Sequence, residues 1–420
     1  MTRENGSFIT IAENREGTFS GDVVGRTLYL RTTYKAQRGR IICVDLNDPE
    51  ERDWWEIIPE QKGVIQGFNI VQDKMIVNVQ ENAYSKLFVY DLNGKLLEEI
   101  KLPTLGTVSG IGSQISNSEI FFSFTSFVYP PTIFRYDIAI NDMKQIEKLS
   151  VDMDLSHYEV NQEWYTSKDG TKIPLFIINK KGLVRNGNNP TVLYGYGGFN
   201  VSMTPSFSAG LFSWLDKGGI YCVANLRGGD EFGEEWHQAG RRDKKQNVFD
   251  DFIAAAEWLI AQKYTNKDKL AIRGGSNGGL LTGAALTQRP DLFRAAIVAV
   301  PLLDMLRYPK FQIARLWIPE YGDPEKENEF RWLYGYSPYH KIKNGTKYPS
   351  VLLMTAESDT RVDPMHARKM AARLQSATSN DAPVLIRIES KAGHGAGKPV
   401  SKIIDAAVDE WSYVMWILGM

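Results

Sequence analysis

Apolar residues in the second two-thirds of the chain form short continuous runs that alternate with stretches of helical period. Runs of this length are typical of buried strands, and the amphipathic stretches between them are typical of helices. The predicted strands are 191–194, 220–224, 269–272, 295–300, 351–356 and 384–388, and the predicted helices are 248–263, 279–286 and 401–418. Such alternation predicts a doubly wound, mainly parallel sheet with helices on both faces. A hairpin at 165–178, turning at Asp169-Gly170, is expected to enter that sheet.

The first third of the chain holds an internal repeat instead. Strand-like segments end in Asp45, Asp91 and Asp137, which are spaced 46 residues apart twice over. An apolar strand of matching phase precedes each of these segments and another follows it. Four short strands in about 40 to 50 residues is the period of a β-propeller blade. The repeated aspartate is interpreted as closing a turn.

Length agrees with two domains, because 420 residues exceed what one hydrophobic core usually supports. We predict a partial β-propeller of about three blades over residues 1–152. We predict an α/β domain over residues 153–420.

A serine between glycines lies where the strand 269–272 meets the helix 279–286. The segment Gly274-Gly275-Ser276-Asn277-Gly278 has the G-x-S-x-G spacing of a nucleophile elbow, which predicts an α/β-hydrolase fold. Glycine tolerates the unusual backbone angles of such a turn and lets the helix approach the sheet. Ser276 is therefore the candidate nucleophile.

A serine hydroxyl needs a base that is oriented by a carboxylate, and in this architecture both follow the serine. Three histidines do so. His366 lies in a predicted helix and is interpreted as a packing or surface group, and His340 as a loop residue. His394 lies among small residues that let its ring reach across a cleft, so it is the favoured base.

The candidate carboxylates follow the predicted strand 351–356. Ligand and catalytic groups of open α/β sheets gather at the carboxyl ends of strands. Asp359 is the favoured orienting acid, and Asp363 and Glu357 remain as rivals.

Charge and cysteine content narrow the classes of partner. The net charge is −1, from 49 basic and 50 acidic residues, so electrostatics gives no reason to expect nucleic acid or a membrane surface. The basic run 241–245 is interpreted as a solvated face. The chain has two cysteines, Cys43 and Cys222, which suggest neither a disulfide framework nor a metal site. A polar start and the lack of a long apolar run favour a cytoplasmic protein.

Beyond these features, the chain resembles the prolyl oligopeptidase family of serine peptidases. The serine signature, with Asp251, Ala255 and Leu259 upstream of Gly274-x-Ser276-x-Gly278, has the family's spacing. The further matching blocks are 193–200, 225–229 with Gly233 and Trp236-His237, and 391–399. The resemblance covers residues from about 155 to the end and extends more weakly upstream.

The resemblance implies Ser276 as nucleophile, Asp359 as orienting acid and His394 as base, with no cofactor and no metal. It implies an oxyanion site formed by the Asn277 backbone N–H and the Tyr196 hydroxyl. Short peptides would be cleaved after proline, whose ring suits a flat, apolar pocket. The residues implied for substrate binding are Trp317, Phe199, Tyr321, Val362, Leu302, which stands where the family usually has valine, and Arg361, which would hydrogen-bond a substrate carbonyl.

The number of blades departs from the family pattern. Propellers close with about four to eight blades, and the resembling family has a full ring that follows a helical segment. Three explanations of the missing blades are expected. The chain is a truncated product, its propeller is completed by self-association or by a partner chain, or the gene model lacks its beginning. Two alternatives to a prolyl peptidase stay open: a related hydrolase of other specificity, and a catalytically silent binding or regulatory form.

Overall fold

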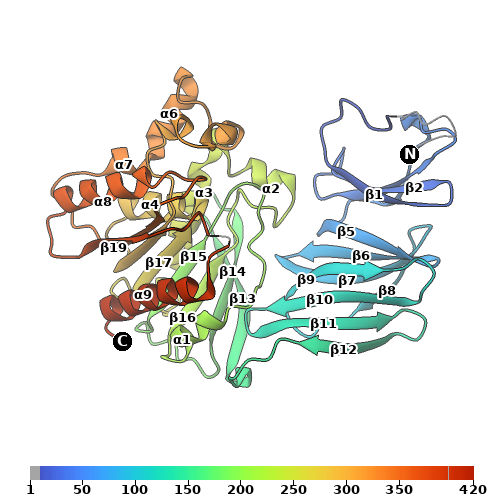
Figure 1. Cartoon of the computed structure of the whole chain (residues 1–420), viewed down its shortest axis with the longest axis horizontal. Coiled ribbons are helices and arrows are strands. Elements are labelled where there is room, and N and C mark those ends of the chain that lie inside the picture. Colours follow the sequence, from blue (N-terminus) through green and yellow to red (C-terminus); the bar gives the residue numbers. More distant parts are fainter. Residues whose placement is uncertain (1–9, 396) are drawn as a thin grey trace. The chain divides into compact units, whose positions relative to one another are not determined.

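The repeat in the first part of the chain folds into antiparallel sheets of four consecutive strands. The computed structural model describes residues 10–395 and 397–420. Within this described part, three such sheets precede residue 151, with strand orders β1-β2-β3-β4, β5-β6-β7-β8 and β12-β11-β10-β9 (Figure 1). Their strands are β1 (Phe19–Val24), β2 (Thr27–Thr32), β3 (Arg40–Asp45), β4 (Trp55–Ile58), β5 (Val64–Val71), β6 (Lys74–Glu81), β7 (Tyr84–Asp91), β8 (Leu96–Ile100), β9 (Thr107–Ser113), β10 (Glu119–Ser126), β11 (Tyr129–Asp137) and β12 (Asp142–Lys148).

The repeated aspartates end the third strand of each sheet and close the turn that follows. The Oδ1 atom of Asp45 accepts a hydrogen bond from the backbone N–H of Asn47 at 2.8 Å, and Asp91 accepts one from Asn93 at 2.9 Å. Asp137 accepts the equivalent bond from residue 139 at 3.0 Å. The prediction of a turn-closing role is confirmed, because a carboxylate two residues before an N–H mimics a backbone turn.

The second part of the chain is built on a mixed, mainly parallel sheet of eight strands. Its order is β13-β14-β16-β15-β17-β18-β19-β20. β13 and β14 form the predicted hairpin, β14 runs antiparallel to β16, and the pairs from β16 to β20 are parallel. The strands are β13 (Tyr158–Thr166), β14 (Lys172–Lys180), β15 (Thr191–Gly195), β16 (Ile220–Ala224), β17 (Leu270–Gly275), β18 (Ala295–Ala299), β19 (Ser350–Ala356) and β20 (Val384–Glu389).

Helices cover both faces of this sheet. On one face, Trp214 of α1 stacks on Trp411 of α9 with ring centroids 5.6 Å apart. On the other face lie α3, α4 and α8 (Figure 1). Their residues Phe252, Leu281 and Met370 pack into one core with strand residues. The helices are α1 (Phe212–Leu215), α2 (Glu234–Gln238), α3 (Gln246–Ala261), α4 (Asn277–Gln288), α5 (Ile318–Tyr321), α6 (Glu327–Tyr336), α7 (Pro338–Lys341), α8 (Met365–Ala377) and α9 (Val400–Leu418). This is the predicted α/β-hydrolase architecture.

A buried ion pair joins α3 to the loop after β16 and to the hairpin turn between β13 and β14. The Arg227 guanidinium donates to both oxygens of Asp251, through Nε at 3.0 Å and Nη2 at 2.6 Å. Asp169, at the hairpin turn, accepts a third bond from Arg227 at 2.5 Å. Bidentate pairing compensates the cost of burying both charges. This contact gives Asp251 and Arg227, two residues of the matching blocks, a structural role.

The chain divides into two compact units. One comprises Met1–Val151 with Thr204–Phe207 and Glu231–Glu235, and the other comprises Asp152–Met203, Ser208–Asp230 and Trp236–Met420. The boundary between independent domains at residues 152 and 153 stays a prediction. None of the helices in the described part of the chain combines the length and apolar character that crossing a bilayer requires.

Candidate active site

Ser276 is the single residue between β17 and α4. Its backbone conformation is one that residues other than glycine rarely adopt. Its φ is 57° and its ψ is −118°. The Ser276 N–H donates to the carbonyl of Ala299, at the end of the neighbouring strand β18, at 2.9 Å. Backbone strain of this kind persists only where the surrounding structure enforces it, and it concentrates at functional sites. The elbow therefore holds the half-buried Ser276 at the carboxyl edge of the sheet.

Two glycines make this turn sterically possible. A Cβ atom on Gly274 would lie 2.1 Å from the carbonyl oxygen of Gly278, and one on Gly278 would lie 2.7 Å from that of Gly195. Both distances are far inside van der Waals contact, with backbone on the other side. By contrast, a Cβ on Gly275 would meet nothing closer than 3.8 Å. Close approach thus accounts for the flanking glycines of the motif but not for Gly275.

An acid–base pair lies at the ends of the next strands along this edge. Asp359 follows β19 and His394 follows β20, and the Nδ1 atom of His394 lies 2.7 Å from Oδ2 of Asp359. The other carboxylate oxygen of Asp359 accepts the backbone N–H groups of Arg361 and Val362, each at 2.9 Å. The side chain of Asp359 is fully buried, whereas that of His394 is 19% exposed.

These contacts keep Asp359 ionised. Burial alone would raise the pKa of its carboxyl, but the bonds from His394 and the two backbone N–H groups hold that pKa below its ordinary value. With Nδ1 engaged, Nε2 is the ring nitrogen left to face a substrate or a serine. Among the described residues, no hydrogen bond joins Ser276 to His394. Catalytic hydrogen bonds are often long before substrate binds, and the third contact of the triad stays a prediction.

The rival residues have other partners. Asp363 accepts the N–H of Met365 at the start of α8 at 2.8 Å, and Glu357 is exposed. His340 contacts the Ser337 hydroxyl through Nδ1 at 2.8 Å. His366 is buried, and its Nδ1 accepts the N–H groups of Leu303 and Asp304 at 3.3 and 3.1 Å. His366 is thus a packing residue.

Burial lowers the pKa of His366 to about 4, which makes a stability prediction. An unfolded histidine titrates near about 6.5, so the stabilisation from neutral His366 is complete above that pH and is lost as the pH falls towards 4. His366→Asn keeps a hydrogen-bond acceptor but does not titrate. When the pH falls from 7 to 4.5, we expect the free energy of unfolding of this variant to fall by about 2 to 3 kcal/mol less than that of the parent. Urea unfolding at both pH values measures this difference. Equal losses in the two proteins would show that His366 does not titrate in this way.

The predicted oxyanion donors come from two neighbouring loops. Tyr196 follows β15 and Asn277 opens α4. Burial raises the pKa of the Tyr196 phenol, and this rise is opposed by the nearby Arg361 guanidinium and, to a smaller degree, by the nearby Ser276 side chain. The phenol is therefore protonated at neutral pH and lies next to the serine. In addition, the Asn277 side chain donates to the Tyr196 carbonyl at 2.6 Å, which joins the two loops.

Phe199 contacts the two other aromatic residues of the predicted pocket. The Phe199 ring meets Trp317 edge-on at 6.3 Å and Tyr321 at 5.5 Å between centroids. Trp317 is half-buried and Tyr321 is fully buried. Val362 is buried beside Asp359, Leu302 is buried in the core of this unit, and Arg361 is exposed.

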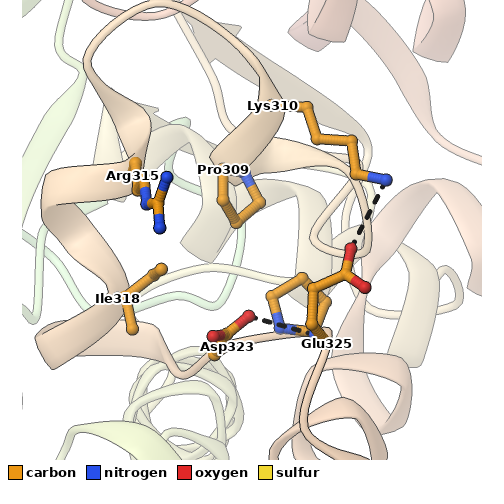
Figure 2. A pocket seen from close by; sticks show the side chains of 7 residues that line it. Pro309, Lys310, Arg315, Ile318, Asp323 and Glu325 are labelled. Atoms are coloured by element: carbon orange, nitrogen blue, oxygen red, sulfur yellow. Dashed lines mark hydrogen bonds and ion pairs between the residues drawn. The ribbon is translucent and has the colours of Figure 1, made fainter.

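A separate surface pocket lies on the segment that carries Trp317. Figure 2 shows its lining, in which Lys310 pairs with Glu325 at 3.4 Å and Asp323 accepts the Glu325 N–H at 3.0 Å. The residues that line this pocket include no serine, cysteine or histidine, so its lining lacks the nucleophile and base of a serine-type site. Among the described residues, no group of three or more His, Cys, Asp and Glu side chains is arranged to hold a metal ion.

A buried polar cluster that the sequence did not predict lies next to the elbow. The prediction that the run 241–245 is a solvated face is wrong for Lys245, because its side chain is only 1% exposed. The run ends just before α3, where Lys245 turns inwards to the Gly197 carbonyl, the Asn277 side chain and Glu320. Glu320 in turn contacts His237. Glu320 lies between Trp317 and Tyr321 in sequence, which is the signal that could have identified it.

The elbow at Ser276 and the pair of Asp359 and His394 at the ends of β19 and β20 define the class of this part of the chain as an α/β-hydrolase. A profile of the prolyl oligopeptidase family matches residues 205–420, and a profile of the N-terminal beta-propeller domain of prolyl oligopeptidases matches residues 1–148. The chain belongs to the prolyl oligopeptidase family.

Individual relatives agree with this assignment. The chain is 43% identical over 400 residues to a prolyl endopeptidase of Elizabethkingia miricola, covering 95% of this chain and 57% of that protein. It is 40% identical over 408 residues to one of Dictyostelium discoideum, with 93% and 54% covered. The chain thus spans little more than half the length of these relatives.

Two solved structures of this family superpose on almost the whole chain. A prolyl endopeptidase structure superposes with a TM-score of 0.94 at 44% identity, over 99% of this chain and 62% of that chain. Prolyl oligopeptidase B of Galerina marginata, bound to a 35mer hydrolysis and macrocyclization substrate, superposes with a TM-score of 0.93 at 34% identity, over 99% and 59%.

Proposed function

We propose that this chain is a serine peptidase that hydrolyses short peptides on the carboxyl side of proline through an acyl-enzyme, without a cofactor. One observation carries the proposal: the His394 imidazole is bound to the buried Asp359 carboxylate at 2.7 Å, at the sheet edge where the elbow presents Ser276. A base oriented by a buried acid is what a serine hydroxyl needs to become a nucleophile.

In the proposed reaction, Nε2 of His394 takes the proton from Ser276 as Oγ attacks the peptide carbonyl carbon. Asp359 stabilises the imidazolium and holds the tautomer that presents Nε2 to the serine. The imidazolium then protonates the leaving amine as the peptide bond breaks, which leaves an ester on Ser276. Water, activated by the same imidazole, hydrolyses the ester and restores the serine.

The negative charge that develops on the carbonyl oxygen would be stabilised by the Asn277 N–H and the Tyr196 hydroxyl. The raised pKa of Tyr196 supports this role, because a protonated phenol is a donor at neutral pH. The N-terminus of α4 adds a favourable field at the same point. Each such donor typically contributes about 10²- to 10³-fold to the rate.

Proline selectivity would come from the aromatic group of Phe199, Trp317 and Tyr321. A proline residue offers a rigid apolar ring and no N–H, so a dry pocket with aromatic walls binds it without leaving a polar group unpaired. Val362 and Leu302 are proposed to complete the walls. The exposed Arg361 is proposed to hydrogen-bond the substrate carbonyl that precedes the proline.

Trp317→Ala is expected to lower the preference for proline more than general hydrolysis. Loss of one ring contact typically costs about 0.5 to 1.5 kcal/mol, so the kcat/KM ratio of a Gly-Pro to a Gly-Ala fluorogenic substrate should fall by up to about tenfold. Trp416→Ala, which removes an indole that is 63% exposed on α9, is the matched control and should leave the ratio unchanged. An unaltered ratio in Trp317→Ala would remove this residue from the pocket.

The cytoplasmic location and the completion of the propeller by self-association or a partner chain stay predictions from the sequence. Light scattering on the purified chain, together with an assay of long and short proline peptides, would test the second of them.

A further inference from the structure

Lys245 is a buried cation that the proposed reaction does not use. Its side chain is 1% exposed. The ammonium donates to the Gly197 carbonyl at 2.8 Å and to Asn277 Oδ1 at 3.2 Å, and it lies 3.7 Å from Glu320 Oε1. An ammonium has three N–H donors, and here three acceptors surround it. Burying such a charge is costly unless it is paired and fully hydrogen-bonded.

The acceptors of Lys245 belong to the two loops that carry the oxyanion donors. Gly197 is the residue after Tyr196, and Asn277 is the residue after Ser276. The Asn277 side chain also bonds directly to the Tyr196 carbonyl and accepts the Tyr321 hydroxyl at 2.9 Å. Lys245 therefore bridges the loop after β15 and the elbow after β17, which the bond between Asn277 and Tyr196 also joins.

Glu320 extends the same cluster to the aromatic pocket. Its Oε1 atom accepts the backbone N–H of Phe199 at 3.0 Å, and its Oε2 atom lies 2.9 Å from Nε2 of His237. Phe199 has a φ of 58°, an unfavourable value for a residue with a side chain. Glu320 thus fixes the loop that holds this strained residue, and it also faces the Lys245 ammonium.

We propose that Lys245 is a positioning residue, which holds the Tyr196 and Asn277 oxyanion donors at the separation that the tetrahedral intermediate requires. This inference rests on the proposed peptidase function and adds a residue outside the triad and the oxyanion site. Preorganised donors act strongly because they need no rearrangement during the reaction, so their support should affect kcat more than KM.

The groups around Lys245 determine how this support depends on pH. Burial lowers the pKa of Lys245 to about 8, and the Glu320 carboxylate opposes that fall. The Tyr321 ring lies 5.4 Å from the ammonium, His237 lies on the far side of Glu320, and Arg242 pairs with Glu329 at 2.9 Å. Above about pH 8 the neutral amine has two N–H groups for three acceptors. Its hydrogen bonds to the Gly197 and Asn277 oxygens then lose the charge that strengthens them, and its ion pair with Glu320 is lost.

The test compares Lys245→Met with Lys244→Met in the full chain. Methionine keeps the length and apolar stem of Lys245 but removes its charge and donors, and Lys244 is the exposed neighbour in sequence. With a Z-Gly-Pro-aminocoumarin substrate, we expect kcat of Lys245→Met to fall by about 10²-fold, with a smaller change in KM. Its pH profile should also lack the alkaline decline of the parent. Lys244→Met should match the parent.

Glu320→Gln provides a second test that needs no deletion of the lysine. Without the carboxylate, the pKa of Lys245 falls further, so the alkaline decline of kcat should move to lower pH. If Lys245→Met does not fold, as judged by near-UV circular dichroism, this shift decides the question. An unmoved decline, or a folded Lys245→Met with kcat within threefold of the parent, would overturn the positioning role alone. A parent chain that does not cleave the substrate would overturn the peptidase function and this inference with it.

Discussion

Ser276→Ala is expected to abolish turnover of a Z-Gly-Pro-aminocoumarin substrate while the protein stays folded. Removing the nucleophile of a serine peptidase typically costs about 10⁶-fold in kcat, because the remaining triad members act only through it. Alanine is slightly smaller than serine, and the strained backbone at this position is enforced by the close glycine contacts. The variant should therefore keep the near-UV circular dichroism spectrum and the unfolding midpoint of the parent.

Ser376→Ala, at an exposed position on α8, is the matched control and should retain full activity. Normal turnover by Ser276→Ala would exclude Ser276 from the mechanism. Contaminating peptidases are excluded when both variants and the parent are purified in parallel and only Ser276→Ala is inactive.

The second large effect is expected from Asp359→Asn, with a fall in kcat of about 10⁴-fold. The Asn side chain still accepts the N–H groups of Arg361 and Val362, so the loop after β19 keeps its geometry. Its NH₂ group, however, faces Nδ1 of His394 and favours the tautomer whose Nε2 carries the proton. That tautomer cannot accept the proton of Ser276.

Asp363→Asn is the matched control, because the Asp363 carboxylate accepts the backbone N–H of Met365 and pairs with no histidine ring among the described residues. It should keep activity within a few-fold of the parent. If Asp363→Asn were as damaging as Asp359→Asn, or if Asp359→Asn remained active, the pairing seen in the structure would not be the one used in catalysis.

Local sequence patterns were sufficient to predict most of the fold. The blade turns follow from a side chain and an N–H two residues apart, so the repeated Asp91 could be interpreted without tertiary information. The elbow is equally local, since Gly274 and Gly278 approach each other within one turn of chain. Period and strand length also predicted the strands 351–356 and 384–388, and the structure pairs these strands, β19 and β20, in parallel, which brings Asp359 and His394 to one edge.

The surroundings of the candidate site could not be predicted in the same way. The choice among Asp359, Asp363 and Glu357 depends on which oxygen meets His394, and this is set by the loop after β19. The burial of Lys245 was further from what the sequence predicted. Four charged residues precede it in sequence, and only the packing of α3 against the elbow turns this one side chain inwards. Burial of a charge depends on partners that are distant along the chain, so charge patterns alone mispredict it.

Covalent trapping of the nucleophile tests the proposed mechanism most directly. The purified chain is treated with a fluorophosphonate, which reacts with activated serines, and the adduct is located by peptide mass mapping. We predict one adduct per chain, on Ser276, with its formation strongly slowed in Asp359→Asn. A chain that cleaves the Z-Gly-Pro substrate but carries its adduct on another residue, or none at all, would contradict the assignment of Ser276 as the nucleophile.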